Sequence, residues 1–315
     1  MNIPSFRRFL IPALSSLVLL ASGSAHAVFR AYLSVSGVDN PACSVAAPCR
    51  LLPAALAAVD PDGEIWMIDS ANFNTAPVAI TKSVTILAIP GALGSVVGNG
   101  GDAFSIGTAG ITVTLQNLVI RNFSGGNVGV YITNAAKVNV INCTIFGFAG
   151  QGDLGIWVNS GVNAPKVNVV GSVIRNNYHG IIVAGNGRVT ISKTHVLGNT
   201  VAGIWINSGT GIAIAHVSDS VSSGNSFGYA VTGSAGAFNS YMYVTRSVAS
   251  ENSGDGFGSG GGITAYMVVG DSIATNNGTG FNNAGGALTF QSRGNNTVTG
   301  NTANTAGTIT FQAGI

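Results

Sequence analysis

The sequence predicts an all-β solenoid in which short strands stack as successive coils along one axis. The first observation is a corner position that recurs at intervals of 22 to 29 residues, at Phe123, Phe148, Asn177, Asn199, Asn225, Asn252, Asn277 and Asn301. The second is a glycine column with the same spacing, at Gly129, Gly155, Gly180, Gly203, Gly228, Gly256 and Gly280. The third is alternation of apolar and polar residues over short stretches between corners, as in Val138–Val140. Repeats of this length are typical of stacked units.

The first 27 residues are predicted to be a secretory signal peptide. Arg7 and Arg8 precede an apolar run from Phe9 to Ala21, and Ala25-His26-Ala27 has the pattern of a cleavage site. The apolar run is shorter than the ~20 residues that a bilayer span needs. We therefore expect an exported chain, secreted or periplasmic, with no transmembrane segment after cleavage.

The charge composition disfavours a nucleic-acid partner. The chain has 13 Lys+Arg and 11 Asp+Glu, and removing Arg7 and Arg8 leaves 11 against 11. A formally neutral protein lacks the counterion-release contribution that drives binding to nucleic acids. The composition does not indicate an oligomeric state.

Cys43 and Cys49 flank a short loop that contains a proline, and in an exported chain this spacing favours a disulfide. Two small buried thiols are the alternative. Cys143 lies within the repeat and is interpreted as a small buried apolar residue.

The corner asparagines predict a ladder along the stack. Leucine-rich repeats share the period but need a leucine column, which is absent. In stacked parallel coils, equivalent residues lie about 4.8 Å apart, so their side-chain amides can hydrogen-bond from coil to coil. Asparagine also tolerates the left-handed backbone of tight corners. Phe123 and Phe148 are expected to replace the ladder by a small aromatic stack.

A second column, Lys193, Asp219, Arg246 and Asp271, alternates in charge at one-coil spacing. A catalytic cluster is one interpretation. A surface charge ladder is the favoured one, because every acid then has a basic neighbour.

The stretch from Tyr32 to Arg50, YLSVSGVDNPACSVAAPCR, resembles the N-terminal segment of secreted bacterial right-handed parallel β-helix proteins, which are similar in fold to pectate lyases. The resemblance covers nearly the whole mature chain. It implies a strand, a cysteine loop and a capping helix within residues 28–62, and a right-handed parallel β-helix of about ten coils over residues 63–315. The helix is expected at Leu51–Val59, with Leu52, Leu56 and Val59 as its apolar stripe.

The same resemblance defines catalytic motifs that this sequence lacks. Glycosidases of the fold carry Asn-x-Asp, Asp-Asp, Gly-His-Gly and Arg-x-Lys motifs, and its lyases hold calcium with clustered acids. Asp153 and Asp255 are expected about four coils, or roughly 20 Å, apart, too far for two-carboxylate hydrolysis. We interpret both as turn residues. No cofactor and no metal site are expected.

Tyr178 and His179 are further candidate ligand-binding residues. His179 is the first residue to test if the protein is an acid–base enzyme, although a solvated loop residue is its favoured interpretation.

The strongest functional feature is an aromatic column. Tyr131, Trp157 and Trp205 each lie two residues after a glycine of the column, between apolar neighbours that fill the core. Alternation turns them outward, where flat rings suit the apolar faces of sugars. The alternative is that residues 124–128 and 146–154 fold over the rings and bury them. We therefore predict binding of an extended glycan or cell-surface polymer, with two alternatives: a polysaccharide lyase or glycoside hydrolase with an atypical site, and a structural or adhesive solenoid.

Overall fold

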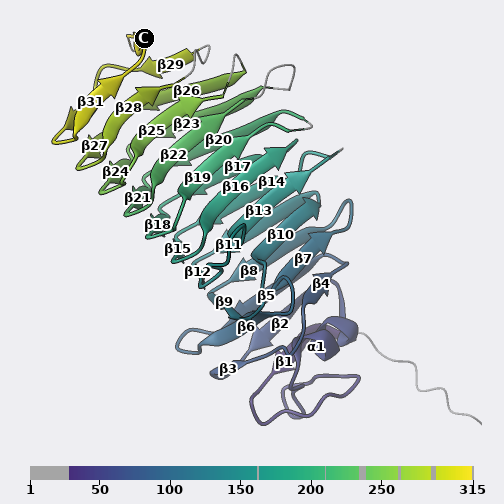
Figure 1. Ribbon diagram of the computed structural model, residues 1–315. Helices are drawn as coiled ribbons and strands as arrows, with labels where there is room; N and C mark the ends of the chain where they lie inside the picture. The colour runs from purple at the N-terminus through teal and green to yellow at the C-terminus, as the bar shows by residue number, and fades with distance from the viewer. Residues whose placement is uncertain are drawn as a thin grey trace, which may run out of the picture.

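The computed structural model describes residues 28–161, 163–209, 211–233, 239–261, 264–284 and 289–313 of the 315-residue chain. The predicted signal peptide, residues 1–27, lies outside the described residues. The chain winds into a parallel β-helix, in which three sheets of 12, 10 and 10 strands run along one axis (Figure 1). The predicted all-β solenoid is confirmed.

Sheet A is the twelve-stranded sheet. Its strands are β1 (Val28–Leu33), β2 (Val59–Met67), β5 (Val84–Ala88), β8 (Thr112–Gln116), β11 (Lys137–Ile141), β14 (Lys166–Val170), β17 (Arg188–Ser192), β20 (Ala213–Ser218), β23 (Ser240–Thr245), β26 (Ala265–Gly270), β29 (Thr289–Ser292) and β32 (Thr310–Phe311).

The strands of sheet B are β3 (Ala71–Asn72), β6 (Gly94–Asn99), β9 (Leu118–Ser124), β12 (Thr144–Phe146), β15 (Val173–Arg175), β18 (His195–Leu197), β21 (Val221–Ser223), β24 (Val248–Ser250), β27 (Ile273–Thr275) and β30 (Thr297–Thr299). In sheet B every strand from β12 onward is three residues long.

Sheet C follows sheet B in each coil. Its strands are β4 (Val78–Ile80), β7 (Phe104–Gly107), β10 (Val128–Asn134), β13 (Leu154–Ser160), β16 (His179–Gly185), β19 (Ala202–Asn207), β22 (Phe227–Thr232), β25 (Asp255–Gly260), β28 (Thr279–Asn283) and β31 (Ala303–Ala306).

Inward-facing residues of the three sheets form one continuous core. Val138, Val167 and Val189 are in register on β11, β14 and β17, and all three are buried. Stacking equivalent β-branched residues fills the interior because each coil presents the same shape to the next. No helix among the described residues is long and apolar enough to cross a membrane.

A short helix and a disulfide lie at the N-terminal end of the core. Helix α1 (Leu52–Ala58) contacts β1, β2 and β4 and buries Leu52 and Leu56. The helix predicted at 51–59 is therefore present but one residue shorter at each end, because Leu51 is its N-cap and Val59 already begins β2. Cys43 and Cys49 form the predicted disulfide. Cys143 is a buried free thiol, and burial raises its pKa to about 12.

The six corner asparagines, Asn177, Asn199, Asn225, Asn252, Asn277 and Asn301, form one hydrogen-bonded column between sheets B and C. Each of the first five donates from Nδ2 to the Oδ1 of the next, over 2.8–3.2 Å. Each Oδ1 from Asn199 to Asn301 also accepts the backbone N–H of the asparagine one coil before. The left-handed backbone falls one residue earlier than expected, as at Asn176 and Glu251 with φ of 55° and 56°.

The prediction that Phe123 and Phe148 stack on each other below this column is wrong. Phe148 is 0% exposed and its backbone N–H donates to the Oδ1 of Asn177. Phe123 is 66% exposed, because β9 continues to Ser124 and carries the ring past the corner. The ring of Phe148 therefore lies inside the core and the ring of Phe123 lies outside it.

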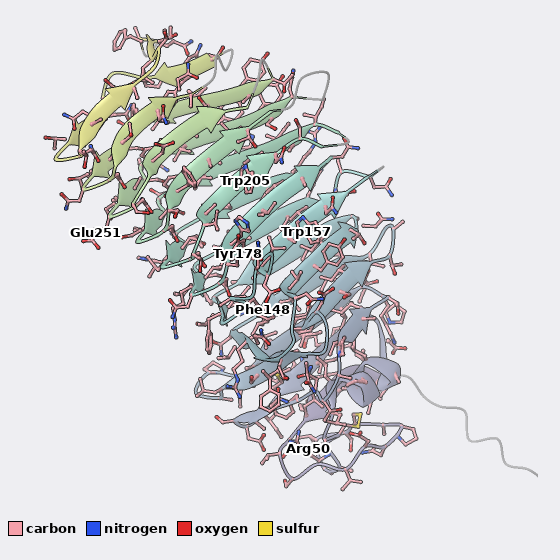
Figure 2. All side chains as sticks on the ribbon, in the orientation of Figure 1. Arg50, Phe148, Trp157, Tyr178, Trp205 and Glu251 are labelled. Carbon is pink, nitrogen blue, oxygen red and sulfur yellow. A yellow bond between two sulfur atoms is a disulfide. The ribbon has the colours of Figure 1, made fainter. Side chains whose placement is uncertain are left out.

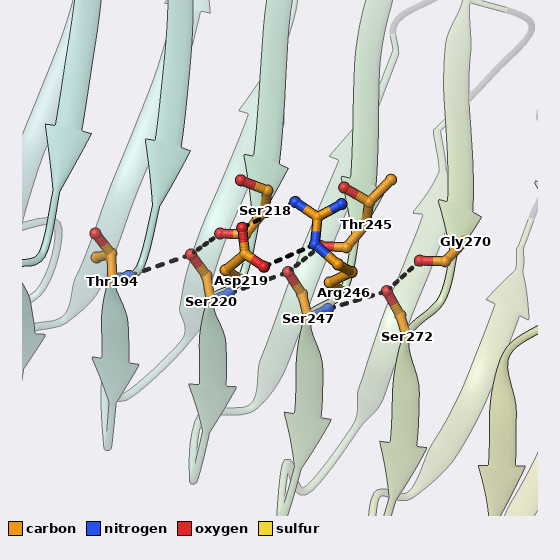
Figure 3. A network of polar contacts seen from close by, with 9 residues as sticks. All are labelled: Thr194, Ser218, Asp219, Ser220, Thr245, Arg246, Ser247, Gly270 and Ser272. Atoms are coloured by element: carbon orange, nitrogen blue, oxygen red, sulfur yellow. Dashed lines mark hydrogen bonds and ion pairs between the residues drawn. The ribbon is translucent and has the colours of Figure 1, made fainter.

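Hydroxyl side chains line the corner between sheets A and B. Thr194, Ser220 and Ser247 each donate a backbone N–H to the hydroxyl of the next coil at 3.2 Å (Figure 3). The residue before each hydroxyl has a left-handed backbone, with φ of 51° at Asp219 and 46° at Arg246. This is the column for which a charge ladder was predicted.

Within the described residues, that column contains one ion pair rather than a continuous ladder. Arg246 donates to both carboxylate oxygens of Asp219, at 2.8 and 3.0 Å. Asp271 instead accepts the side-chain amide of Asn295, and Lys193 forms no ion pair in the described chain. Both partners of the pair are exposed, so it contributes about 0–1 kcal/mol.

Candidate functional site

The aromatic residues singled out from the sequence lie on the outer face of sheet C. Tyr131, Trp157, Ile182, Trp205 and Ala230 are in register on β10, β13, β16, β19 and β22. Figure 2 shows Trp157 and Trp205 on one face near the middle of the solenoid. The residues on either side of each tryptophan are buried in the core, so alternation directs the indoles outward.

Some of these aromatic rings are covered on one face by a neighbouring ring. Tyr131 and Trp157 stack with their centroids 4.7 Å apart and their planes 24° apart. In-register parallel strands are spaced at nearly the distance that stacked rings prefer, so neighbours in a column cover each other. Both tryptophans are half-buried, so the surrounding residues border the rings without covering them.

A hollow of about 300 Å³ separates the two indoles. Trp157 and Trp205 are two coils, or ~10 Å, apart, and the shorter side chain of Ile182 lies between them. The hollow is also lined by Gly152, Leu154, His179, Ala184 and Asn207. It is therefore a slot with an indole at each end.

A second hollow, of about 230 Å³, lies on the other side of Trp205. Small residues create it, because the outward column continues from Trp205 to Ala230 and then to Gly258. The lining is almost entirely apolar, with Phe227 and Asp255 at its border. Trp205 is shared by both hollows, and its indole N–H donates to the Oγ1 of Thr232 at 2.8 Å, which holds the ring in place.

Asp255 is a part of this site that the sequence interpretation missed. It was interpreted as a turn residue, but it is the first residue of β25 and borders the apolar hollow. Its carboxylate lies over Gly258, where a Cβ would come within 2.8 Å of Oδ2. Burial raises the pKa of Asp255, and the amide of Asn282, which donates to Oδ2 at 3.0 Å, acts in the opposite direction. The sequence did contain a signal for this hollow, because the side chains of the outward column become smaller from Trp205 to Ala230 and Gly258.

His179 is buried, which corrects its interpretation as a solvated loop residue. It is the first residue of β16 and only 8% exposed. Its ring centroid lies 5.4 Å from that of Trp205, and the ring of Tyr178 packs edge-on against it at 4.9 Å. Nδ1 has no hydrogen-bond partner within the described chain. Tyr178 thus supports the imidazole and does not line either hollow.

The environment of His179 predicts a pH-dependent loss of stability. Burial lowers the pKa of His179 to about 4, from 6.5, so the unfolded chain binds this proton more tightly. We expect the free energy of unfolding to fall by about 1–2 kcal/mol between pH 7 and pH 4, less than the full shift would give because water reaches the ring through the hollow. Urea titrations of wild type and His179→Gln at several pH values measure this contribution as a difference. A difference that stays constant with pH would contradict it.

The titratable residues of this face are too dispersed for paired acid–base chemistry. His179 and Asp255 are three strands, or roughly 14 Å, apart. Asp153 accepts the backbone N–H of Gly150 at 3.0 Å within its own turn. Across the described ranges no group of three His, Cys, Asp or Glu residues could hold a metal ion. The arrangement offers apolar slots with a neutral imidazole and one carboxyl group at their edges.

Comparisons with known proteins agree with this architecture. A model of the "Right handed beta helix region" family matches residues 102–303. The fold is similar to that in the crystal structure of pectate lyase Pel9A, with a TM-score of 0.67 and 15% identity over 90% of this chain and 77% of that chain. It is also similar to the GH136 lacto-N-biosidase from Eubacterium ramulus, with a TM-score of 0.50 and 12% identity over 90% of this chain and 68% of the other.

No curated protein sequence matches the chain. The family match spans well over half of the 315 residues, and the three parallel sheets agree with it. The protein therefore belongs to the right-handed β-helix family, with a fold like that of pectate lyases.

Proposed function

We propose that the protein is exported and binds an extended glycan along the outer face of sheet C. The observation that carries the proposal is the pair of adjoining hollows that share Trp205. Binding sites for small molecules are mostly apolar concavities with a few polar groups, and both hollows have this character. The disulfide between Cys43 and Cys49 fits the oxidising environment that export provides.

A sugar ring suits the slot between the two indoles. The faces of Trp157 and Trp205 that border the slot supply apolar surface for the C–H groups of the ring. His179 lines the slot and is neutral at pH 7, so it presents an uncharged imidazole to the sugar. The next sugar of a chain that runs along the axis would reach the second hollow beyond Trp205. Pectate lyase and lacto-N-biosidase, the two proteins of similar fold, act on carbohydrates by their names.

Replacing Trp205 with alanine is expected to weaken glycan binding by about 30-fold, because it removes the wall that both hollows share. The double variant Trp157→Ala/Trp205→Ala is expected to abolish retention by neutral polysaccharides. The measurement is affinity electrophoresis against a panel of neutral and acidic polysaccharides, with circular dichroism to verify folding.

Trp66→Ala is the matched control, since Trp66 is also half-buried but belongs to β2 of sheet A. Its retention should equal that of wild type. If no polysaccharide in the panel retains the wild type, glycan binding is wrong and a structural or adhesive solenoid is the better explanation.

An enzyme is the second candidate, and Asp255 is the observation that favours it. A carboxyl group whose pKa is raised in an apolar hollow is suited to act as a general acid. Two-carboxylate hydrolysis needs a second acid within about 5–9.5 Å, and His179 is the other titratable group of the hollows, at roughly 14 Å. Release of oligosaccharides from the same panel that is lost in Asp255→Asn would establish this alternative; absence of turnover leaves binding as the function.

A further inference from the structure

Charge is unevenly distributed over the outer face of sheet A. The nine strands from β5 to β29 contain three charged residues, Lys137, Lys166 and Arg188, and no acidic residue. These three, which we name the cation row, begin β11, β14 and β17 and lie opposite one another in register. Because neighbouring strands are about 4.8 Å apart, the row spans ~10 Å along the axis.

The cation row has no partner within the described part of the chain. All three side chains are exposed, and none takes part in a hydrogen bond or an ion pair there. All 11 acidic residues of the protein lie within the described ranges, so no undescribed segment supplies a counter-charge. Like charges opposite one another on adjacent strands destabilise a sheet. The free protein therefore carries an electrostatic repulsion among these three side chains, which a bound anion would relieve.

Groups that bind hydroxyls surround the cation row. A depression of about 530 Å³ contains all three cations together with Asn168, Thr190 and His216. Asn168 donates to the Oδ1 of Asn139 at 2.9 Å, so the amides form a short line parallel to the cations. The surface thus combines positive charge with amide and hydroxyl groups.

Four rings continue the surface toward the C-terminal end, and we name them the ring row: His216, Tyr241, Tyr243 and Tyr266. His216 stacks on Tyr243 at 5.0 Å and 10°, and Tyr241 stacks on Tyr266 at 4.7 Å and 16°. Because the planes face one another along the axis, their edges, which carry phenol and imidazole groups, point to solvent. These edges offer hydrogen bonds rather than stacking faces.

We propose that the outer face of sheet A is a second binding surface, which takes a linear acidic polysaccharide along the axis of the solenoid. Its anionic groups lie at the cation row, and its hydroxyls contact the amides and the edges of the ring row. This surface is separate from the hollows of sheet C and does not depend on the function proposed for them.

The ring geometry favours a polysaccharide over a nucleic acid. Proteins that bind single strands stack bases on open aromatic faces, whereas these rings cover one another. The formal neutrality of the mature chain also gives no general attraction for a phosphate backbone. A hydroxyl-rich polymer with regularly placed anions matches both parts of the surface.

The test uses the full-length mature protein and four probes: alginate, dextran sulfate, uncharged dextran and duplex DNA. We expect Lys166→Gln to weaken binding of the acidic polysaccharide about fivefold, and Lys137→Gln/Lys166→Gln/Arg188→Gln to weaken it by about 100-fold. Affinity should also fall steeply with added salt, because exposed charges are screened beyond ~10 Å at 0.1 M. Preference for alginate or for dextran sulfate identifies carboxylate or sulfate as the bound group.

Arg121→Gln is the matched control, since it removes one exposed positive charge from sheet B and should change affinity less than about twofold. The triple variant should melt at or slightly above the wild-type temperature and keep any binding that depends on Trp205. Conversely, Trp157→Ala/Trp205→Ala should keep its affinity for the acidic polysaccharide. Equal affinity of wild type and triple variant, no binding to either acidic polysaccharide, or tighter binding to DNA would each overturn the proposal.

Discussion

Replacing Asn225 with alanine is expected to lower the free energy of unfolding by about 4 kcal/mol. Its Oδ1 accepts the backbone N–H and the Nδ2 of Asn199, at 2.8 and 2.9 Å. Its Nδ2 donates to the Oδ1 of Asn252 and to the carbonyl of Val196, both at 3.2 Å. Asn225 is 3% exposed, so water cannot satisfy the groups that lose their partner. Each buried group left unsatisfied costs about 1–3 kcal/mol, and two donors of Asn199 are among them.

Urea denaturation followed by circular dichroism measures this loss, with Asn168→Ala as the control. Asn168 lies on the outer face of sheet A, is half-buried and makes one side-chain hydrogen bond, to Asn139. Its replacement should cost less than about 1 kcal/mol. Equal losses in the two variants would show that the ladder stabilises the fold no more than a surface amide does.

Gly180→Ala is expected to cost about 3 kcal/mol, although it adds a single methyl group. A Cβ at this position would lie 2.4 Å from the carbonyl oxygen of Gly203 and 2.5 Å from Cγ1 of Val196. The first of these atoms is backbone of the next coil, so it cannot turn away as a flexible side chain would. The coil must separate from its neighbour or lose hydrogen bonds of the ladder. Thermal unfolding of the variant measures the effect.

Gly161→Ala is the comparison, because a Cβ there meets no atom within 4 Å and the backbone is not left-handed. The change should leave the melting temperature unaltered or raise it slightly, since alanine restricts the unfolded chain. A melting temperature of Gly180→Ala close to that of Gly161→Ala would contradict a packing role for the glycine column.

Features that depend on the repeat were predictable from the sequence. A period of about two dozen residues places Asn199 above Asn177 and Trp157 above Tyr131 without knowledge of any distance. Alternation then assigns the inner and outer side of each strand. The Cys43–Cys49 disulfide followed from spacing and from the predicted export.

Features that depend on contact between coils were not predictable in this way. Spacing alone does not show that Tyr131 covers one face of Trp157, because that depends on ring rotation. His179 and Asp255 were placed in loops because each precedes a glycine, yet both begin strands. The burial of His179 depends on Trp205 of the next coil, whereas Asp255 lies over Gly258 of its own strand and accepts the amide of Asn282 from the next coil. Phe123 differs from Phe148 because β9 is longer than the later strands of sheet B.

The asparagine column has a direction. From Asn177 to Asn277 every amide-to-amide hydrogen bond of the column runs from Nδ2 to the Oδ1 one coil closer to the C-terminus, and none of these bonds is reversed. The amide dipoles therefore add head to tail and polarise one another, unlike the strands of a sheet, whose dipoles largely cancel. The two ends of the solenoid consequently differ in electrostatic potential. Substituting one asparagine weakens the hydrogen bonds of all the others. The loss of stability in a double variant at two neighbouring positions should therefore be smaller than the sum of the losses in the two single variants.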